Sequence, residues 1–222
     1  MSTNERMNDL QGPGEVPTVF LIDDDPSARR GLARLIQAAG HAVATFASAR
    51  EFLASGQNNA PGCMVLDIRM PELSGLDLQE QLLRADYSMP IIFVTGQGDI
   101  PMTVQAMKRG AIDFLPKPVE RQQLLRAIRE ALEKDRLARS AREESRELQE
   151  RLQLLKTRER EVMSFVIAGS LNKQIAAELG ITEATVKVHR ARLMEKLGVT
   201  SVAELVTLAQ KTGIRATKPA VQ

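Results

Sequence analysis

The sequence of 222 residues contains no tryptophan, one tyrosine and a single cysteine, Cys63. A lone cysteine cannot form an internal disulfide, and within the apolar run CMVLD it is expected to be a small buried side chain. No apolar run approaches the roughly 18 residues of a membrane-spanning helix, so no membrane partner is expected. The first 16 residues lack the apolar core of a signal peptide and predict a disordered lead-in, with the cytoplasm as the default location.

Aromatic residues are also scarce in the C-terminal half, where Phe165 is the only one beyond residue 118. This scarcity argues against a protein that stacks single-stranded nucleic acid on aromatic rings. Charge is uneven as well. Residues 17–118 carry 9 basic and 11 acidic groups, whereas residues 157–222 carry 10 basic and 6 acidic groups. The length predicts about two domains, and the charge favours a nucleic-acid partner for the second.

Short apolar segments alternate with helical patterns over the first half of the chain. Strands are predicted at 18–22, 42–46, 63–67, 90–95 and 111–115. A helix is predicted after each strand, at about 27–40, from Ser48, at 75–84, at 100–110 and from Glu120 onward. Continuously apolar strands between helices are typical of a parallel sheet that is covered on both faces. The predicted fold class is α/β, a doubly wound five-stranded parallel sheet with right-handed crossovers.

Polar side chains follow the predicted strands at their carboxyl ends. Three aspartates at 23–25 follow the first strand, Asp67 ends the third, Thr95 ends the fourth, and Lys117 follows the fifth. In a doubly wound sheet this edge holds the ligand crevice, so these residues are expected to converge. Clustered carboxylates suit a divalent cation such as Mg²⁺, and an aspartate beside it can attack a phosphoryl group whose oxygens Thr95 and Lys117 contact. A cis bond between Lys117 and Pro118 would aim the lysine inward, but the sequence leaves the isomer open.

The segments LIDDD, VLDIRMP, VTGQGD and FLPKP resemble, in their order and spacing, the receiver domain of two-component response regulators. The resemblance covers roughly residues 17–133 and implies the CheY-like strand order 2-1-3-4-5. It implies that Asp67 is the phosphoacceptor, that Thr95 is the switch hydroxyl and that Lys117 is the phosphate-sensing amine. Phe114 stands where many receivers have an aromatic switch residue, and it has no hydroxyl to form a hydrogen bond.

The same resemblance implies a site for Mg²⁺ (or Mn²⁺). Asp24 would be a direct ligand and Asp23 a ligand that acts largely through water. Asp67 and the backbone carbonyl of Arg69 would complete the set. Asp25 is left with two alternatives, a further metal ligand or a charge at the N-terminus of the following helix.

A haloacid-dehalogenase-like phosphatase is the enzyme alternative, because it also uses an aspartyl nucleophile. That family has a second aspartate two residues after the nucleophile, whereas Arg69 stands two residues after Asp67. We therefore expect a protein that accepts a phosphoryl group on its own aspartate, and not an enzyme that turns over an external substrate.

From Glu120 to about Leu155 the sequence has neither glycine nor proline. Good helix formers dominate this stretch, and a continuous helix of its length would span about 54 Å. Its central part, EKDRLARSAREESRE, has few large apolar residues. Two alternatives stay open for the predicted linker helix at 134–155: a solvated helix held by Glu–Arg pairs, or a dimeric coiled coil.

The C-terminal segment at 156–216, which a tail at 217–222 follows, predicts a helix-turn-helix domain. Thr157 is the predicted N-cap of a helix over REREVMSFVIAG, Asn172 of a helix over KQIAAEL, and Thr182 of the next helix. Two short helices around a tight glycine turn, the second rich in lysine and arginine, are typical of this motif.

The stretches TREREV, NKQIAAELGITEATVKVH and KLGV resemble the LuxR-type DNA-binding domain. With the receiver, the whole chain resembles the FixJ subfamily of transcriptional regulators, among its members with an extended linker helix. In the helix after Thr182, Lys187 and Val188 face outward and are suited to base contacts, and other basic residues suit phosphates. The predicted DNA-contacting residues are Lys173, Thr185, Lys187, Val188, Arg190, Ala191, Arg192 and Lys196.

These features together predict a response regulator of transcription. The chain has two histidines and no phosphohistidine box, so a separate sensor histidine kinase is the expected phosphodonor. Phosphorylation is expected to promote homodimerisation through the face of residues 100–109 and 111–115, and binding to duplex DNA, with RNA polymerase as a further partner. The other alternative is a regulator whose basic domain docks on a protein, and salt-dependent, sequence-selective binding to DNA distinguishes the two.

Overall fold

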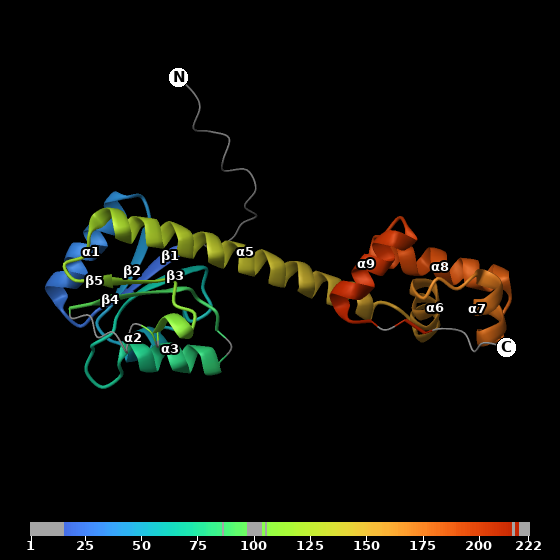
Figure 1. The fold of residues 1–222 in the computed structure, drawn as a ribbon, viewed down its shortest axis with the longest axis horizontal. Helices are drawn as coiled ribbons and strands as arrows, with labels where there is room; N and C mark the ends of the chain where they lie inside the picture. Colours follow the sequence, from blue (N-terminus) through green and yellow to red (C-terminus); the bar gives the residue numbers. More distant parts are fainter. Residues whose placement is uncertain (1–15, 86, 97–103, 105, 215, 218–222) are drawn as a thin grey trace, which may run out of the picture. The chain divides into compact units, whose positions relative to one another are not determined.

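The computed structural model describes residues 16–85, 87–96, 104, 106–214, 216 and 217 (Figure 1). Contacts within the chain divide it into two compact units, residues 1–139 and 140–222. Nearly all of the predicted lead-in and of the predicted tail lies outside the described residues. Of the helix predicted at 100–110, residue 104 and residues 106–108 are described as helical, and residues 100–103 and 105 lie outside the described part.

The first unit is built on a sheet of five parallel strands in the order β2-β1-β3-β4-β5. The strands are β1 (Thr18–Ile22), β2 (Ala42–Phe46), β3 (Gly62–Asp67), β4 (Ile91–Thr95) and β5 (Asp113–Pro116). The predicted fold class and strand order are confirmed. The last strand begins two residues later than predicted, because the Ala111 N–H bonds back to the Ala106 carbonyl and pairing with β4 starts at Asp113.

Helices cover both faces of this sheet (Figure 1). The helices α1 (Pro26–Ala38) and α5 (Arg121–Gln153) pack on one face, where Ile36, Leu124 and Ile128 are fully buried against the strands. The helices α2 (Ala49–Ala54) and α3 (Gly75–Arg84) pack on the other face. The three central strands are buried almost throughout, which explains why their sequences are continuously apolar rather than alternating.

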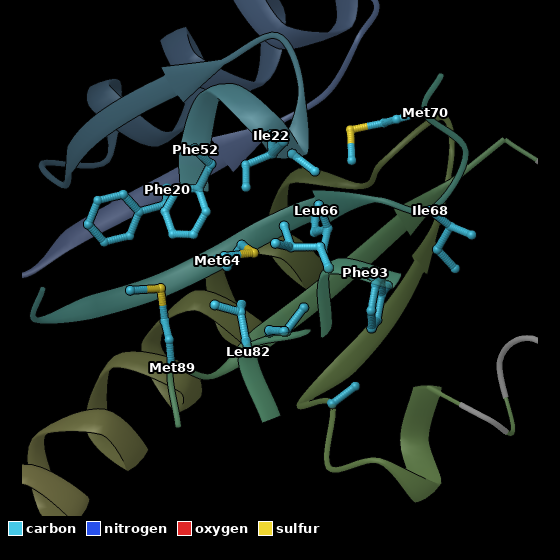
Figure 2. Close-up of a cluster of buried hydrophobic side chains, with 14 of the residues drawn as sticks. Phe20, Ile22, Phe52, Met64, Leu66, Ile68, Met70, Leu82, Met89 and Phe93 are labelled. Atoms are coloured by element: carbon cyan, nitrogen blue, oxygen red, sulfur yellow. The ribbon is translucent and has the colours of Figure 1, made fainter. Parts of the chain in front are cut away.

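Large side chains fill the space between the sheet and the helices α2 and α3 (Figure 2). Phe20 and Phe52 meet edge to face with ring centroids 5.7 Å apart, and Met64, Leu66 and Phe93 extend the same cluster. Burial of each such side chain stabilises the fold by about 1.5–3 kcal/mol. The core therefore holds the strand ends of the first unit in a fixed arrangement.

A buried ion pair fastens α5 to the first unit up to Arg139. The Asp135 carboxylate is 4% exposed and accepts hydrogen bonds from the Gly62 N–H (2.9 Å) and from Arg139 Nε (2.8 Å). Arg139 Nη2 also donates to the Ala60 carbonyl (2.7 Å). Gly62 has no room for a side chain, because a Cβ there would lie 1.9 Å from the Thr18 carbonyl oxygen. The packed part of α5 thus ends at Arg139.

The next part of α5, residues 140–147, is exposed along its whole length. Its charged residues pair along the helix: Arg146 with Glu143 (2.5 Å) and Glu150 (3.0 Å), and Arg151 with Glu147 (3.6 Å). These are the pairs that the solvated-helix alternative requires, and the coiled-coil alternative stays a prediction. None of the helices in the described part of the chain is both long and apolar enough to span a membrane.

The second unit is a helical domain with its own core. Its helices are α6 (Thr157–Ile167), α7 (Asn172–Leu179), α8 (Glu183–Leu197) and α9 (Val202–Thr212). Val186, Leu193 and Leu197 form the buried face of α8. Gly180 lies between α7 and α8 in the left-handed conformation (φ 64°), which glycine adopts without steric cost. The predicted helix-turn-helix is confirmed.

Two of the three predicted N-caps in this unit are wrong by one residue. Thr157 is the first residue of α6 instead of its cap, because the Glu159 carboxylate accepts the N–H of Lys156 (2.9 Å) and starts the helix there. Asn172 is likewise the first residue of α7, because Gln174 accepts the N–H at position 171. Thr182 caps α8 as predicted, accepting the N–H at position 185 (3.2 Å).

Candidate functional site

The polar residues of the first unit meet at the carboxyl edge of the sheet, where β1 and β3 lie side by side. This is the point at which strand order 2-1-3-4-5 reverses direction, and ligands bind at such points in doubly wound sheets. Because Ile22 pairs with Leu66, the next residues, Asp23 and Asp67, lie beside each other. The register of two buried strands therefore brings two carboxylates together from positions far apart in the sequence.

The loop after β1 holds Asp23 and Asp25 in different roles. Asp23 is 1% exposed, and its Oδ1 accepts the Asp25 N–H (2.9 Å). The Arg29 guanidinium donates to the backbone carbonyl of Asp23. Asp25 Oδ1 accepts the Ser27 N–H (2.8 Å) and caps α1. Of the two alternatives for Asp25, the role at the helix N-terminus is confirmed.

Lys117 bridges the two buried carboxylates. Its Nζ lies 2.7 Å from Asp23 Oδ2 and 2.6 Å from Asp67 Oδ2. The bond from Lys117 to Pro118 is cis, and the Lys117 N–H donates to the Thr95 carbonyl (2.7 Å). The N–H bond ties the backbone of Lys117 to the end of β4, and the ammonium lies between the two carboxylates.

Burial and charge act against each other in this cluster. Burial raises the pKa of the Asp23 carboxyl, and the hydrogen bond from Lys117 opposes this rise without cancelling it. Burial also acts to lower the pKa of Lys117, but its hydrogen bonds to Asp23 and Asp67 outweigh burial and raise it above its ordinary value. The ammonium is thus the internal counter-charge of the cluster at neutral pH.

The other predicted residues of this edge lie around Asp67. Asp67 is 7% exposed, and its Oδ1 accepts the Arg69 N–H (3.1 Å). Thr95 is buried at the end of β4, one residue beyond Val94, which pairs with Asp67. Phe114 is half-buried on β5 and packs against the core cluster beneath the sheet. These positions put a carboxylate, a hydroxyl and an aromatic ring on neighbouring strands.

The carboxylates are close enough to share a cation. Oxygen atoms of Asp23, Asp24 and Asp67 lie within 4.8 Å of one another, and Asp24 is exposed at the mouth of the cluster. A hard divalent cation takes oxygen ligands and keeps several of its waters, so one or two direct carboxylates with an open side suit it. The donor set fits a divalent metal ion, with Asp24 as the residue that solvent reaches.

In the second unit, the outward face of α8 carries four of the eight predicted DNA-contacting residues. Lys187, Val188, Ala191 and Arg192 are exposed, and Val188 is 47% exposed although it is apolar. Thr185, at the start of the helix, is half-buried beside its cap. Lys173 is exposed on α7. The face combines positive charge with a small apolar surface, which suits base edges and phosphates in a major groove.

Arg190 and Lys196 differ from these residues, because both are half-buried in bonds within the unit. Arg190 Nη1 donates to Asn172 Oδ1 (2.7 Å), which joins α8 to α7. Lys196 Nζ lies 2.6 Å from Glu159 Oε2 and 3.1 Å from the Leu154 carbonyl.

The buried acids Asp135 and Glu159 were not identified from the sequence. Glu159 is 2% exposed and lies at the helical spacing of the apolar residues Val162, Met163 and Val166 on α6. An acid on an apolar face is the signal of a buried ion pair, since a charge is rarely buried without a partner. Asp135 has the same signal, because it lies four residues after the buried Ala131.

Comparison with known proteins identifies both units. Residues 19–129 match the response regulator receiver domain, and residues 153–209 match the bacterial regulatory proteins of the luxR family. Nodulation protein W of Bradyrhizobium diazoefficiens is 48% identical over 198 residues, covering 89% of this chain and 87% of that protein. The response regulator protein TodT of Pseudomonas putida is 46% identical over 193 residues, covering 87% of this chain and 85% of that protein.

Among solved structures, that of the response regulator StyR is 51% identical, with a TM-score of 0.84, and covers 89% of this chain and 100% of that chain. Regulators of this kind are DNA-binding proteins without an enzymatic activity of their own, so the phosphatase alternative is set aside. The chain belongs to the two-component response regulators that join a receiver domain to a LuxR-type DNA-binding domain and regulate transcription.

Proposed function

We propose that this regulator is switched by Mg²⁺-dependent (or Mn²⁺-dependent) phosphorylation of Asp67, with a partner sensor histidine kinase as phosphodonor. The phosphorylated form dimerises and binds a specific sequence of duplex DNA. The observation that carries the proposal is the position of Asp67, which lies next to Asp23 at the reversal point of the sheet with the Lys117 ammonium 2.6 Å from its carboxylate. The proposed place of this chemistry is the cytoplasm, and RNA polymerase is a further proposed partner.

In the proposed reaction the Asp67 carboxylate attacks phosphorus, a new O–P bond forms, and the N–P bond to the histidine of the kinase breaks. A divalent cation held by Asp23, Asp24, Asp67 and the Arg69 carbonyl would supply positive charge to the incoming phosphoryl oxygens. The Arg69 N–H donates a hydrogen bond to Asp67 Oδ1 (3.1 Å) and so orients the carboxylate. The ammonium of Lys117 already lies at the carboxylate and can pair with a phosphoryl oxygen instead.

The proposed switch then moves from the phosphoryl group to the surface. The Thr95 hydroxyl turns toward the phosphoryl group, and Phe114 moves into the space that this opens. Thr95 ends β4 and Phe114 lies on β5, and these two strands are paired in the sheet. The proposed dimer face comprises β5 and the helix predicted at 100–109, whose residues 100–103 and 105 lie outside the described part of the chain.

We propose a receiver domain at 17–133, a linker helix at 134–155 and a DNA-binding domain at 156–216. Two observations refine these limits. The Asp135 and Arg139 bonds to the loop before β3 extend the receiver body to residue 139. The exposed length of α5 then begins at residue 140, where the two compact units divide.

The decisive test of this function is DNA binding by the full-length protein with and without a small phosphodonor and Mg²⁺. The expected result is tighter, sequence-selective binding to one duplex after phosphorylation, with an affinity that falls as salt is raised. Binding that ignores both sequence and phosphorylation would instead favour the alternative, a basic domain that docks on a protein.

Metal binding is expected to raise the melting temperature of the protein and to depend on Asp24. A ligand at about 100 times its dissociation constant stabilises the folded state by about 2.7 kcal/mol. The Asp24→Asn variant should lose most of the increase that Mg²⁺ produces in a thermal melt. Asp25→Asn is the matched control, because its side chain caps α1 and asparagine caps a helix equally well. An equal response in both variants would contradict the assignment of Asp24.

The face of α8 is expected to separate base contacts from phosphate contacts. Lys187→Ala should weaken binding to the specific duplex more than to a random duplex, by about 1–3 kcal/mol for a lost base contact. Arg192→Ala should weaken both alike and flatten the dependence of affinity on salt. Titrations of both duplexes at several salt concentrations measure this, with Lys211→Ala on α9 as the control. Equal losses on both duplexes for Lys187→Ala would make it a phosphate contact.

A further inference from the structure

The end of the linker helix α5 is capped by side chains of the DNA-binding domain. The last carbonyls of a helix have no partner within it and need donors from elsewhere. Arg160 Nη2 donates to the Leu152 carbonyl (3.0 Å), and Arg160 Nε donates to the Leu155 carbonyl (3.2 Å). Lys196 Nζ donates to the Leu154 carbonyl (3.1 Å). Three carbonyls at this helix end are thus held by two cations, one on α6 and one on α8.

Lys196 also carries the charge that balances a buried acid. Its Nζ lies 2.6 Å from Glu159 Oε2, and the Glu159 side chain is 3% exposed. Glu159 accepts the Lys156 N–H as well, so the residue directly before α6 is bound to the same carboxylate. Burial acts to raise the pKa of Glu159, but the bonds from Lys196 and Lys156 outweigh it and lower the pKa. The Glu159 carboxylate therefore stays charged at neutral pH, and its bond and that to the Leu154 carbonyl use two of the three donors of the Lys196 side chain.

Apolar packing joins the same parts. Leu152 and Leu155 are 9% and 5% exposed and belong to one cluster with Leu193 and Leu197 of α8. Arg151 of α5 also lies close to the end of α8. A Cβ built on Gly198, the C-cap of α8, would be 3.3 Å from Nη1 of Arg151. A cation at a helix C-terminus is favoured by the helix dipole. The last turn of α5 and the residues directly after it therefore pack as part of the DNA-binding domain.

We propose that Lys196 and Arg160 form a clamp that joins the end of the linker helix rigidly to the recognition helix α8. Lys196 is then a positioning residue, in place of the phosphate contact expected from the sequence. A rotation or shift of α5 would pass to α8 through the clamp, whereas without it residues 154–156 would act as a hinge. This inference rests on the proposed function, because it states how phosphorylation of the receiver reaches the DNA-binding surface.

The test uses full-length Lys196→Met and Arg160→Met, which keep the aliphatic stem and remove the donors, with Lys211→Met as control. The quantity measured is the ratio of specific-DNA affinity with and without phosphorylation, together with its salt dependence. We expect the ratio to fall at least about fivefold in both clamp variants and to stay unchanged in the control. A merely less stable protein would lose affinity in both states and keep the ratio. Lys196→Arg should restore it.

The salt dependence distinguishes the clamp from a DNA contact. Loss of one phosphate contact lowers the slope of log affinity against log salt by about 0.9, whereas loss of the clamp leaves the slope unchanged. An unchanged ratio, or a lowered slope in Lys196→Met, overturns the proposal. Because Lys196→Met leaves the buried Glu159 carboxylate without its counter-charge, the double variant Lys196→Met with Glu159→Met repeats the measurement in a protein free of that charge.

Hydrogen exchange separates failure of the clamp from failure of the proposed function. The clamp predicts that amides 154–156 are protected in the unmodified protein and lose protection in both clamp variants, independently of phosphorylation. If phosphorylation does not change DNA binding by the unmodified protein, the proposed function is wrong. The hydrogen-exchange measurement then tests the clamp independently of DNA binding. Equal protection of these amides in all variants overturns it.

Discussion

The Asp67→Asn protein is expected to take up no phosphoryl group from a small phosphodonor. The amide keeps the size of the carboxylate but lacks the negative charge and the nucleophilic oxygen that attack phosphorus. Lys117 keeps its bond to Asp23 Oδ2 (2.7 Å), so the rest of the cluster retains a counter-charge and the protein should stay folded. The measurement is incorporation of label from the phosphodonor in the presence of Mg²⁺, followed by DNA binding of the same sample.

The consequence for DNA binding should be equally complete. With no acyl phosphate to recruit Thr95 and Lys117, the variant should bind the specific duplex equally well with and without phosphodonor. Asp25→Asn is again the matched control, since it changes a neighbouring aspartate of the same edge that caps α1. Normal label uptake by Asp67→Asn would show that another residue is the phosphoacceptor.

Insertion of two residues after Glu144 is expected to uncouple phosphorylation from DNA binding. Each helical residue turns the chain by about 100° and lengthens it by about 1.5 Å, so two residues rotate everything beyond by about 200°. Seven residues rotate it by about 700°, close to two full turns, and should be better tolerated. The insertion point lies in the exposed length of α5, where residues 140–147 make no core contact in the described structure.

The expected loss for the two-residue insertion is large, because two DNA-binding domains that cannot reach paired half-sites together lose an avidity of about 10²-fold or more. The measurement is the affinity of the phosphorylated variants for the specific duplex, with a random duplex as the control for an intact DNA-binding surface. If neither insertion changes the specific affinity, the linker is a flexible tether, and both the rigid helix and the clamp at its end lose their role.

Much of the fold was predictable because its signals are local. The apolar runs of β1, β3 and β4 are buried on both faces, so each reads as a strand without knowledge of its neighbours. The alternation of these runs with helices restricts the sheet to a parallel one. Polar residues that directly follow buried strands, such as Asp23 and Asp67, must then share one edge. The acidic cluster was therefore predictable from order alone.

Only the tertiary structure decided which polar groups pair. Lys117 and Asp23 are 94 positions apart, and their bond depends on the order and register of the strands that they follow. Lys196 illustrates the same limit, because its place on a basic helix predicts a phosphate contact, whereas its bond to the buried Glu159 carboxylate (2.6 Å) is visible only in the structure. Sequence periodicity shows which face of a helix is apolar, because residues three or four positions apart lie on the same face. It does not report a partner on another element, because a long-range pair forms only where packing brings two surfaces together.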